Sequence, residues 1–305
     1  LLSLPAIQPS GNTFLLSVGI SAYTAKDNKA LSFKNCATDA RSYAAFFESQ
    51  FKNINGEKSA RKLYSSLLVN EEATRENILT AINNAISNSK PEDYFIFNFS
   101  GYCKPLKDSS GKQVTYFVPY GTGPISDTGA IRRLGLPLSQ LKDLLQMIPA
   151  NNQLFITEAG ATDDFQKEFI RALIESSPSI AALSNKNRVF IVPNGSGLDQ
   201  FVCKGAGLEQ GPISYFVTNL SPELNMYGIF EKGIYADAVA FNLNKTAVDC
   251  DYFRTGYFDI FFEREFVKDL HDYLPEEVMQ SRGAGVTNKA KAAVAGAISK
   301  KYALM

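Results

Sequence analysis

Two kinds of hydrophobic pattern alternate along the chain. Short, nearly continuous apolar runs have the length and composition of strands that are buried on both faces of a sheet. The clearest runs are Thr13–Ile20, Arg61–Val69, Asp93–Ser100, Leu154–Thr157 and Arg188–Pro193. Val114–Pro119 predicts one further short strand.

Segments with helical spacing follow most of these runs. After the first run, apolar residues recur at the spacing of one helix face, at Ala40, Ala44, Phe47 and Phe51. Further helices are expected over Thr74–Ser89, Pro137–Ile148, Asp163–Ser176, Gly211–Leu220, Phe262–Tyr273 and Val286–Met305. Gly121–Gly135 is expected to be a glycine-rich loop, and the aromatic-rich stretch Gly228–Asp259 to form either strands or a long loop.

This order of elements predicts the fold class. Strands that alternate with helices of about 10 to 16 residues dictate a parallel sheet with right-handed crossovers. We therefore expect an α/β fold, a three-layer α/β/α sandwich with a mostly parallel sheet and helices on both faces. One large domain is expected at 13–285, between a linker or arm at 1–12 and a helical tail at 286–305.

The charge balance limits the partners. Lys plus Arg (31) equals Asp plus Glu (31) and no basic run occurs, so we expect neither nucleic acid nor an anionic membrane as a ligand. No apolar segment approaches the roughly 20 residues that span a bilayer, so no membrane insertion is expected. A protein or peptide partner fits best. By default we expect a cytoplasmic location, or an extracytoplasmic one if a leader has been removed before Leu1.

Few side chains offer metal or cofactor chemistry. The four cysteines lie far apart without a CxxC motif, and His271 is the one histidine, so we expect neither a zinc site nor a disulfide framework. The glycine-rich phosphate-binding loops are absent, so no cofactor is expected. His271 falls off the apolar stripe of its helix, which is typical of a solvated residue. Cys103, just after the run Asp93–Ser100, offers one alternative, a Cys103–His271 dyad.

The run Leu154–Thr157 is the centre of the functional argument. It is followed at once by Glu158 and by small residues up to Ala161. In open parallel sheets the ligand crevice lies beyond the carboxyl ends of the strands, so these residues should lie at its lip. The tip carries no nucleophile, because glycine and alanine stand where a cysteine or serine would be expected.

Several segments together resemble the caspase-like cysteine peptidases, most closely their metacaspase and bacterial branch. The main ones are Phe14–Ile20, Phe33–Ala40, Asp93–Cys103 and Phe155–Ala161. Weaker likenesses are found in Ala73–Ile78, Leu136–Leu141, Asp199-Gln200, Gly211–Leu220 and Phe266–Val278. The resemblance covers roughly residues 13 to 280 and implies that 13–285 is a caspase-like domain.

The resemblance also locates the catalytic positions. In the family, the third strand ends in Ser-Gly-His-Gly, whose histidine is the general base, and the fourth ends in Asp-x-Cys or Gln-Ala-Cys, whose cysteine is the nucleophile. The matching positions here are Tyr102 and Gly160. The resemblance therefore implies a pseudo-caspase that lacks the family's cysteine endopeptidase activity.

Two acidic residues match a second family feature. In metacaspases an acid in the first helix and an acid just before the nucleophile hold the basic side chain of the substrate, and these positions are Asp39 and Glu158 here. The resemblance implies a pocket for Arg or Lys. The residues alone leave another interpretation open, in which Asp39 stabilises the start of its helix and Glu158 pairs with a nearby lysine.

We therefore expect a catalytically inactive caspase-like domain that binds a protein or peptide, with a basic residue in the ligand, or serves as a scaffold within a larger chain or complex. Two alternatives stay open. One is an active cysteine endopeptidase, selective for Arg or Lys, that uses Cys103 as a relocated nucleophile. The other is a purely structural domain of a larger assembly.

Overall fold

A central sheet organises the computed structural model, which describes residues 11–23, 35–55, 60–160, 186–193, 203–205, 208–221, 223–231, 233–249 and 258–262. The main strand order is β10-β7-β6-β3-β1-β2. In that order the strands are Phe258–Phe262, Asn187–Pro193, Asn152–Gly160, Tyr94–Lys107, Thr13–Gly19 and Leu63–Val69. Neighbouring strands are parallel except for β10, which is antiparallel to β7.

Smaller strands extend this arrangement. β4, at Gln113–Phe117, pairs antiparallel with the second half of β3, and β5, at Leu136–Pro137, pairs with β4. β8 (Cys203–Gly205) and β9 (Leu208–Gln210) form a separate hairpin.

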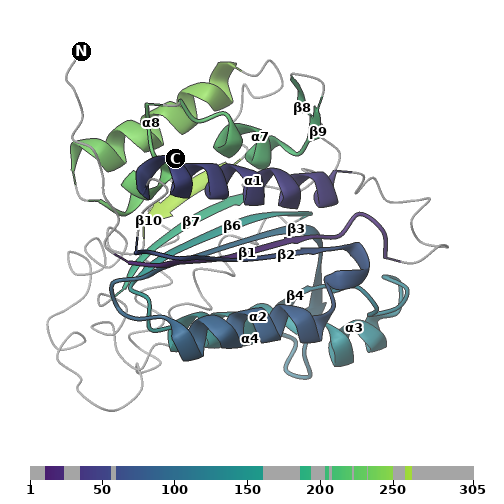
Figure 1. The fold of residues 1–305 in the computed structure, drawn as a ribbon. Coiled ribbons are helices and arrows are strands. Elements are labelled where there is room, and N and C mark those ends of the chain that lie inside the picture. Colours follow the sequence, from purple (N-terminus) through teal and green to yellow (C-terminus); the bar gives the residue numbers. More distant parts are fainter. Residues whose placement is uncertain are drawn as a thin grey trace, which may run out of the picture.

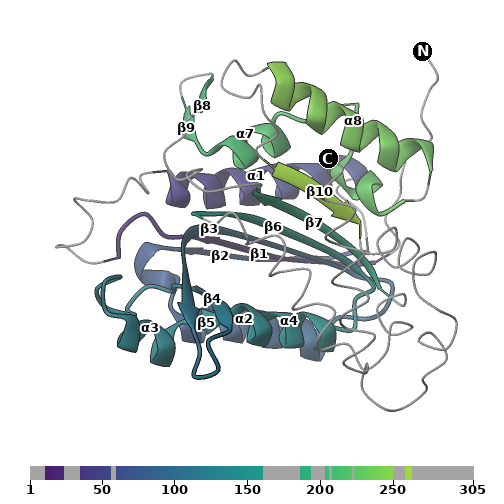
Figure 2. The ribbon, with the colours of Figure 1, turned by 180° about the vertical axis from the view of Figure 1, so that it is seen from behind.

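Helices cover both faces of the sheet (Figure 1). On one face lie α1 (Cys36–Asn55), α7 (Pro212–Thr218) and α8 (Ile234–Asp249), and on the other lie α2 (Arg75–Asn88), α3 (Thr128–Leu134) and α4 (Leu138–Met147). The opposite view shows the same two layers of helices (Figure 2). Short 3-10 helices η1 and η3 occupy Asn70–Glu72 and Met226–Phe230. The predicted three-layer α/β/α sandwich with a mostly parallel sheet is confirmed.

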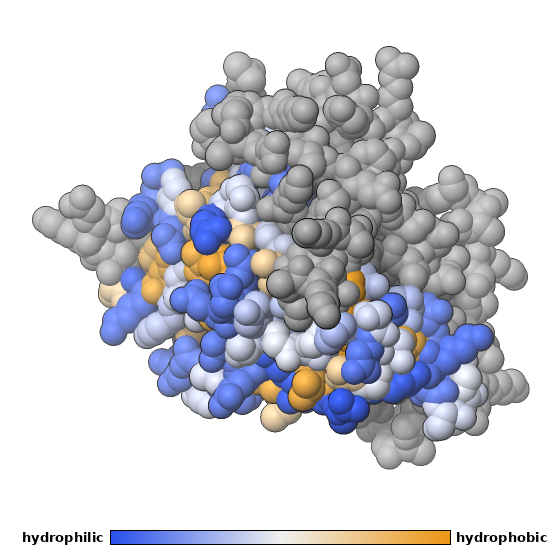
Figure 3. Space-filling view, turned by 90° about the vertical axis from the view of Figure 1, so that its right-hand side faces the viewer, coloured by the Kyte–Doolittle hydropathy of each residue, from blue (hydrophilic) through white to orange (hydrophobic). Residues whose placement is uncertain are grey.

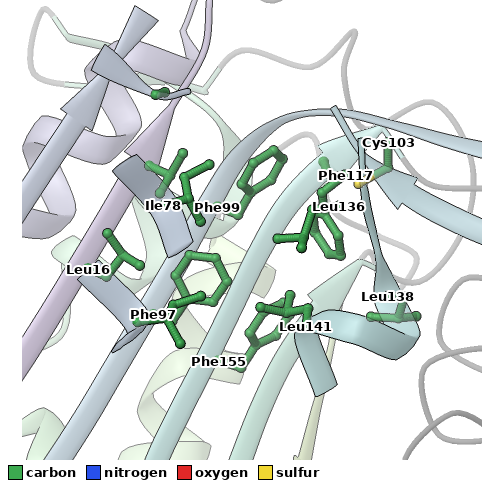
Figure 4. Close-up of a cluster of buried hydrophobic side chains, with 14 of the residues drawn as sticks. Leu16, Ile78, Phe97, Phe99, Cys103, Phe117, Leu136, Leu138, Leu141 and Phe155 are labelled. Atoms are coloured by element: carbon green, nitrogen blue, oxygen red, sulfur yellow. The ribbon is translucent and has the colours of Figure 1, made fainter. Parts of the chain in front are cut away.

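Alternation along the strands divides the hydrophobic core in two. In β1, Phe14, Leu16 and Val18 face the layer of α2 and α4, whereas Leu15 faces the layer of α1 and α7. The first core contains a row of phenylalanines (Figure 4), whose members are Phe97, Phe99, Phe117 and Phe155. The predicted stripe of α1, from Ala40 to Phe51, is buried, as its spacing required.

Three expectations of local structure were wrong. Part of the supposed loop Gly121–Gly135 forms α3, because Asp127 accepts a hydrogen bond from the Ala130 amide (2.9 Å) and Ile131 is buried. The stretch Gly228–Asp259 contains α8, since Tyr235, Val239 and Leu243 recur every four residues and are buried. The third strand also continues past Ser100 to Lys107, because β4 pairs with the extension.

Other predicted segments lie outside the described residues. These are most of the arm at 1–12, the helices Asp163–Ser176 and Phe262–Tyr273 apart from Phe262, the tail at 286–305, and the residues Asp199, Gln200 and His271.

Candidate functional site

The two positions that the resemblance marks as catalytic lie opposite each other. β3 and β6 are parallel neighbours, and their register pairs Tyr102 with Gly160, and Ser100 with Glu158. Adjacent strands are about 4.8 Å apart, so a base and a nucleophile at the first pair would be within reach of each other. Tyr102 and Gly160 therefore lie opposite each other on neighbouring strands, Tyr102 within β3 and Gly160 at the end of β6.

The surroundings of Tyr102 are largely filled by the protein itself. Its side chain is half-buried, and Lys104 Nζ lies 5.9 Å from the centroid of its ring, which is within cation–π range. The Tyr102 amide donates a 2.6 Å hydrogen bond to the hydroxyl oxygen of Tyr23. An added Cβ at Gly101 would lie 2.8 Å from that oxygen, so this close approach of Tyr23 requires glycine. Burial, and then the neighbouring Cys36, raise the pKa of Tyr23 well above its usual value, so its hydroxyl stays neutral.

Cys103 does not lie on an open strand tip. It is within the extended β3, pairs with Phe117 of β4 and is 3% exposed. Figure 4 shows its thiol beside Phe117 and Leu136 in the first core. A thiol in such apolar surroundings packs as a small hydrophobic group. The suggested partner of Cys103, His271, lies outside the described residues.

Asp39 and Glu158 converge on the start of α7. The Gly211 amide donates a 2.8 Å hydrogen bond to Asp39 Oδ1. The amides of Ile213 and Ser214 donate to the two carboxylate oxygens of Glu158, at 2.7 and 2.8 Å. Both acids are buried. These carboxylates therefore use the free amides and the positive dipole end of α7 rather than those of α1.

These hydrogen bonds differ from the interpretation in which Asp39 stabilises its own helix and Glu158 pairs with a lysine, while the pocket for a basic side chain stays a prediction. Asp39 binds the start of another helix instead of its own, and Glu158 binds backbone amides of α7. Gly211 makes the contact sterically feasible, because a Cβ there would lie 2.2 Å from Glu158 Oε1. The pair Gly211-Pro212, a glycine before a proline at a helix start, was the sequence signal for this element.

Burial strongly affects the charge of the pair. Loss of solvent raises the pKa of Asp39 to about 7, although hydrogen bonds with Gly211 and Ser214 oppose the increase. Burial and then the Asp39 charge raise the pKa of Glu158 well above its usual value, against the effect of the Ser214 and Ile213 amides. The pair therefore holds a proton near neutral pH.

Two buried hydroxyls near the pair were missed by the sequence analysis. Tyr43, on α1, is buried and close enough to both acids for their charges to raise its pKa, but its hydroxyl makes no hydrogen bond of ordinary geometry. The hydroxyl of Ser100, the register partner of Glu158, is also buried without a hydrogen-bond partner in the structure.

The end of the molecule that holds this site is seen in Figure 3. Strands β1, β2 and β3 run towards it, and its coloured surface is mostly hydrophilic, with apolar patches in between. Within the described ranges, no group of three or more His, Cys, Asp or Glu residues is placed to hold a metal ion. No helix in that part of the chain is long and apolar enough to cross a bilayer.

Comparisons with known proteins agree with the geometry. A search of curated proteins finds no match. A crystal structure of a Geobacter sulfurreducens protein is similar at 15% identity, with a TM-score of 0.49, and covers 82% of this chain and 93% of its own; this similarity is too low to support an inference. Residues 15–120 match the family model described as the metacaspase peptidase C14 domain. The resemblance to the caspase-like family is thereby confirmed over residues 15–120, where the chain is similar to the metacaspase domain.

Proposed function

We propose that this chain is a caspase-like domain that does not cleave peptides and instead binds a protein or peptide, through a site that accepts a basic side chain. The register of β3 against β6 carries this proposal. It sets Tyr102 opposite Gly160 at the positions where the family has its base and its nucleophile. Near neutral pH the phenol of Tyr102 does not act as a general base, and Gly160 has no side chain that could act as a nucleophile.

The two cysteines whose side chains the structure describes support the same conclusion. Cys36 and Cys103 are both buried, and Cys103 is packed among aromatic side chains. A cysteine nucleophile needs access to the substrate and a neighbouring base that removes its proton. Cys103 is 3% exposed and therefore lacks the required access.

The acidic pair supports the choice of ligand. Asp39 and Glu158 accept hydrogen bonds from backbone amides, which carry only partial positive charge. The pKa values of both acids are raised, so these hydrogen bonds do not offset the effects of burial and of mutual repulsion. A guanidinium or ammonium group beside the pair would favour the doubly ionised state. Binding of a basic side chain should therefore release a proton near pH 7.

The proposed test is calorimetric titration of two peptides that differ only in Arg against norleucine. The Arg peptide should bind about 10- to 100-fold more tightly, which corresponds to one partly buried charge-assisted contact. Its binding enthalpy should depend on the ionisation enthalpy of the buffer, because a proton is released.

Matched variants locate the effect. Glu158→Gln should remove most of the preference, whereas Glu76→Gln, at an exposed position on α2, should leave it unchanged. Equal affinity for both peptides would contradict the proposed pocket for a basic side chain. Asp39 and Glu158 would then serve only to hold the start of α7. Turnover of a peptide substrate that is abolished by Cys103→Ala would reject the pseudoenzyme and favour a peptidase with a relocated nucleophile.

A further inference from the structure

β2 forms an exposed edge of the sheet that carries neither charge nor proline. Among the described residues it pairs with β1 alone, so its outer side offers unused backbone groups. Tyr64 is 40% exposed and Leu67 is 36% exposed. Proteins usually protect such an edge with charged side chains, a bulge or a proline, because an unprotected edge pairs with other strands.

The backbone geometry shows which groups are available. The Thr13 amide donates to the Lys62 carbonyl oxygen at 2.9 Å, so the polar groups of Lys62 point towards β1. These directions alternate along a strand. The N–H and C=O groups of Leu63, Ser65, Leu67 and Val69 therefore point away from β1, to the side where no described strand pairs with β2.

From this edge we propose that a second copy of the chain adds its own β2 antiparallel, about a two-fold axis at Ser66. This arrangement pairs Leu63 with Val69 and Ser65 with Leu67, and all of these residues have outward-pointing backbone groups. It also sets Tyr64 opposite Leu68 on the face that packs against the first core. Directly opposed apolar side chains stabilise an antiparallel pair.

Charges at the two ends of β2 identify a second copy as the partner. Arg61 and Lys62 precede the strand, and the exposed Glu71 and Glu72 follow it. The chain turns at Asn70 into the 3-10 helix Asn70–Glu72, so the acidic residues lie just past the end of the strand. An antiparallel second copy therefore brings the basic start of each β2 towards the acidic end of the other, at both ends of the pair.

The first test is sedimentation of the whole chain over a range of concentrations. A pair of seven-residue strands forms a small interface, so a reversible dimer with a Kd on the order of 1 to 100 μM is expected. Ser65→Pro removes an outward-pointing donor and leaves the β1 ladder intact. It should weaken the dimer by roughly 100-fold or more, while Met147→Lys, an apolar-to-charged change at an exposed position on α4, should not.

A charge exchange tests the antiparallel two-fold arrangement. Arg61→Glu and Glu71→Lys each place like charges together at both ends of the dimer, so each variant alone should have a Kd roughly 10-fold higher. An equimolar mixture should recover the dimer, because in the heterodimer both contacts join opposite charges again. Thermal unfolding of each variant checks that the fold is retained.

Three results would overturn the proposal. One is a monomer up to millimolar concentration, which would leave the edge to another strand or to no partner. The second is a dimer that Ser65→Pro does not weaken. The third is a mixture of the two charge variants that associates no better than either variant alone.

Discussion

At the scale of single residues, the acidic pair shows how far a tertiary contact can change a side chain. Asp39 follows the start of α1 in the sequence, yet its carboxylate binds the amide of Gly211. A carboxylate in the first turn of α1 would be expected to stabilise the start of that helix, but Asp39 binds the start of α7 instead. The charge of the pair depends on burial more than on the type of residue.

The raised pKa values predict a pH-dependent stability. The folded protein binds these protons more tightly than the unfolded chain, in which aspartic acid titrates near pH 3.9. The free energy of unfolding should therefore fall as the pH rises from about 4 through about 7. Asp39→Asn removes part of this slope, so its stability relative to the wild type should increase over that interval. Urea unfolding at a series of pH values measures the difference.

An exposed aspartate provides the control. Hydrogen bonds from Ser110 are the main reason why the pKa of Asp108 is lowered. Asp108 therefore stabilises the folded protein above the ordinary titration range of aspartic acid, and this stabilisation is lost at lower pH. The pH dependence has the opposite sign to that of Asp39. Asp108→Asn should therefore run parallel to the wild type above pH 5. Parallel curves for Asp39→Asn and the wild type would contradict the assigned charge state of the pair.

At the scale of elements, α7 is attached to the sheet through its first turn. Glu158, at the carboxyl end of β6, holds two of its amides, and Gly211 allows the helix to come this close. β2 shows the opposite situation, because one side of the strand is fully paired and the other pairs with no strand in the described ranges. The contacts at the start of α7 and at the outer side of β2 therefore tell more about the roles of these elements than their first and last residues do.

The close contact at Gly211 predicts the effect of adding one methyl group. Gly211→Ala places a Cβ 2.2 Å from Glu158 Oε1, so either the carboxylate or α7 must move. We expect a loss of about 1 to 3 kcal/mol in the free energy of unfolding. Gly129→Ala in α3 is the matched change, because its nearest contact is a side-chain oxygen at 3.2 Å, and it should be neutral or slightly stabilising. Equal effects of both substitutions in urea unfolding would show that α7 is not tightly packed against Glu158.

At the scale of the whole molecule, the sheet brings Tyr102 of β3 and Gly160 of β6 together whether or not catalytic groups stand there. Gly160→Cys alone should therefore not produce a peptidase. A cysteine with an ordinary pKa near 8.5 is mostly protonated at neutral pH, and Tyr102 offers no imidazole to remove the proton.

Assays with Arg and Lys peptide substrates check this expectation. The double variant Tyr102→His/Gly160→Cys is the informative comparison, since it places both family residue types in the observed register. Cleavage by the Gly160→Cys variant alone would show that another group already acts as a base.

Much of the fold could be predicted because its signals are local. The apolar runs and the helical stripes depend on residues within a few turns of each other, and they predicted β1, α1, α2, β6 and β7. The failures occurred where local signals compete. Glycines obscured α3, and aromatic residues, which are frequent in strands, obscured α8. The end of β3 was misplaced because its extension depends on pairing with β4.

The sequence by itself determined the layered α/β fold, because hydrophobic periodicity and the order of elements suffice for it. The two substituted positions, Tyr102 and Gly160, were indicated by the resemblance to the caspase-like family, and the register of β3 and β6 sets them opposite each other. Only the tertiary structure decided what the acids do. Asp39 and Gly211 are 172 residues apart, and Glu158 and Ile213 are 55 apart, so no local pattern relates them. Their hydrogen bonds and their proton affinity arise from long-range packing, which removes water and brings distant backbone amides to a buried charge.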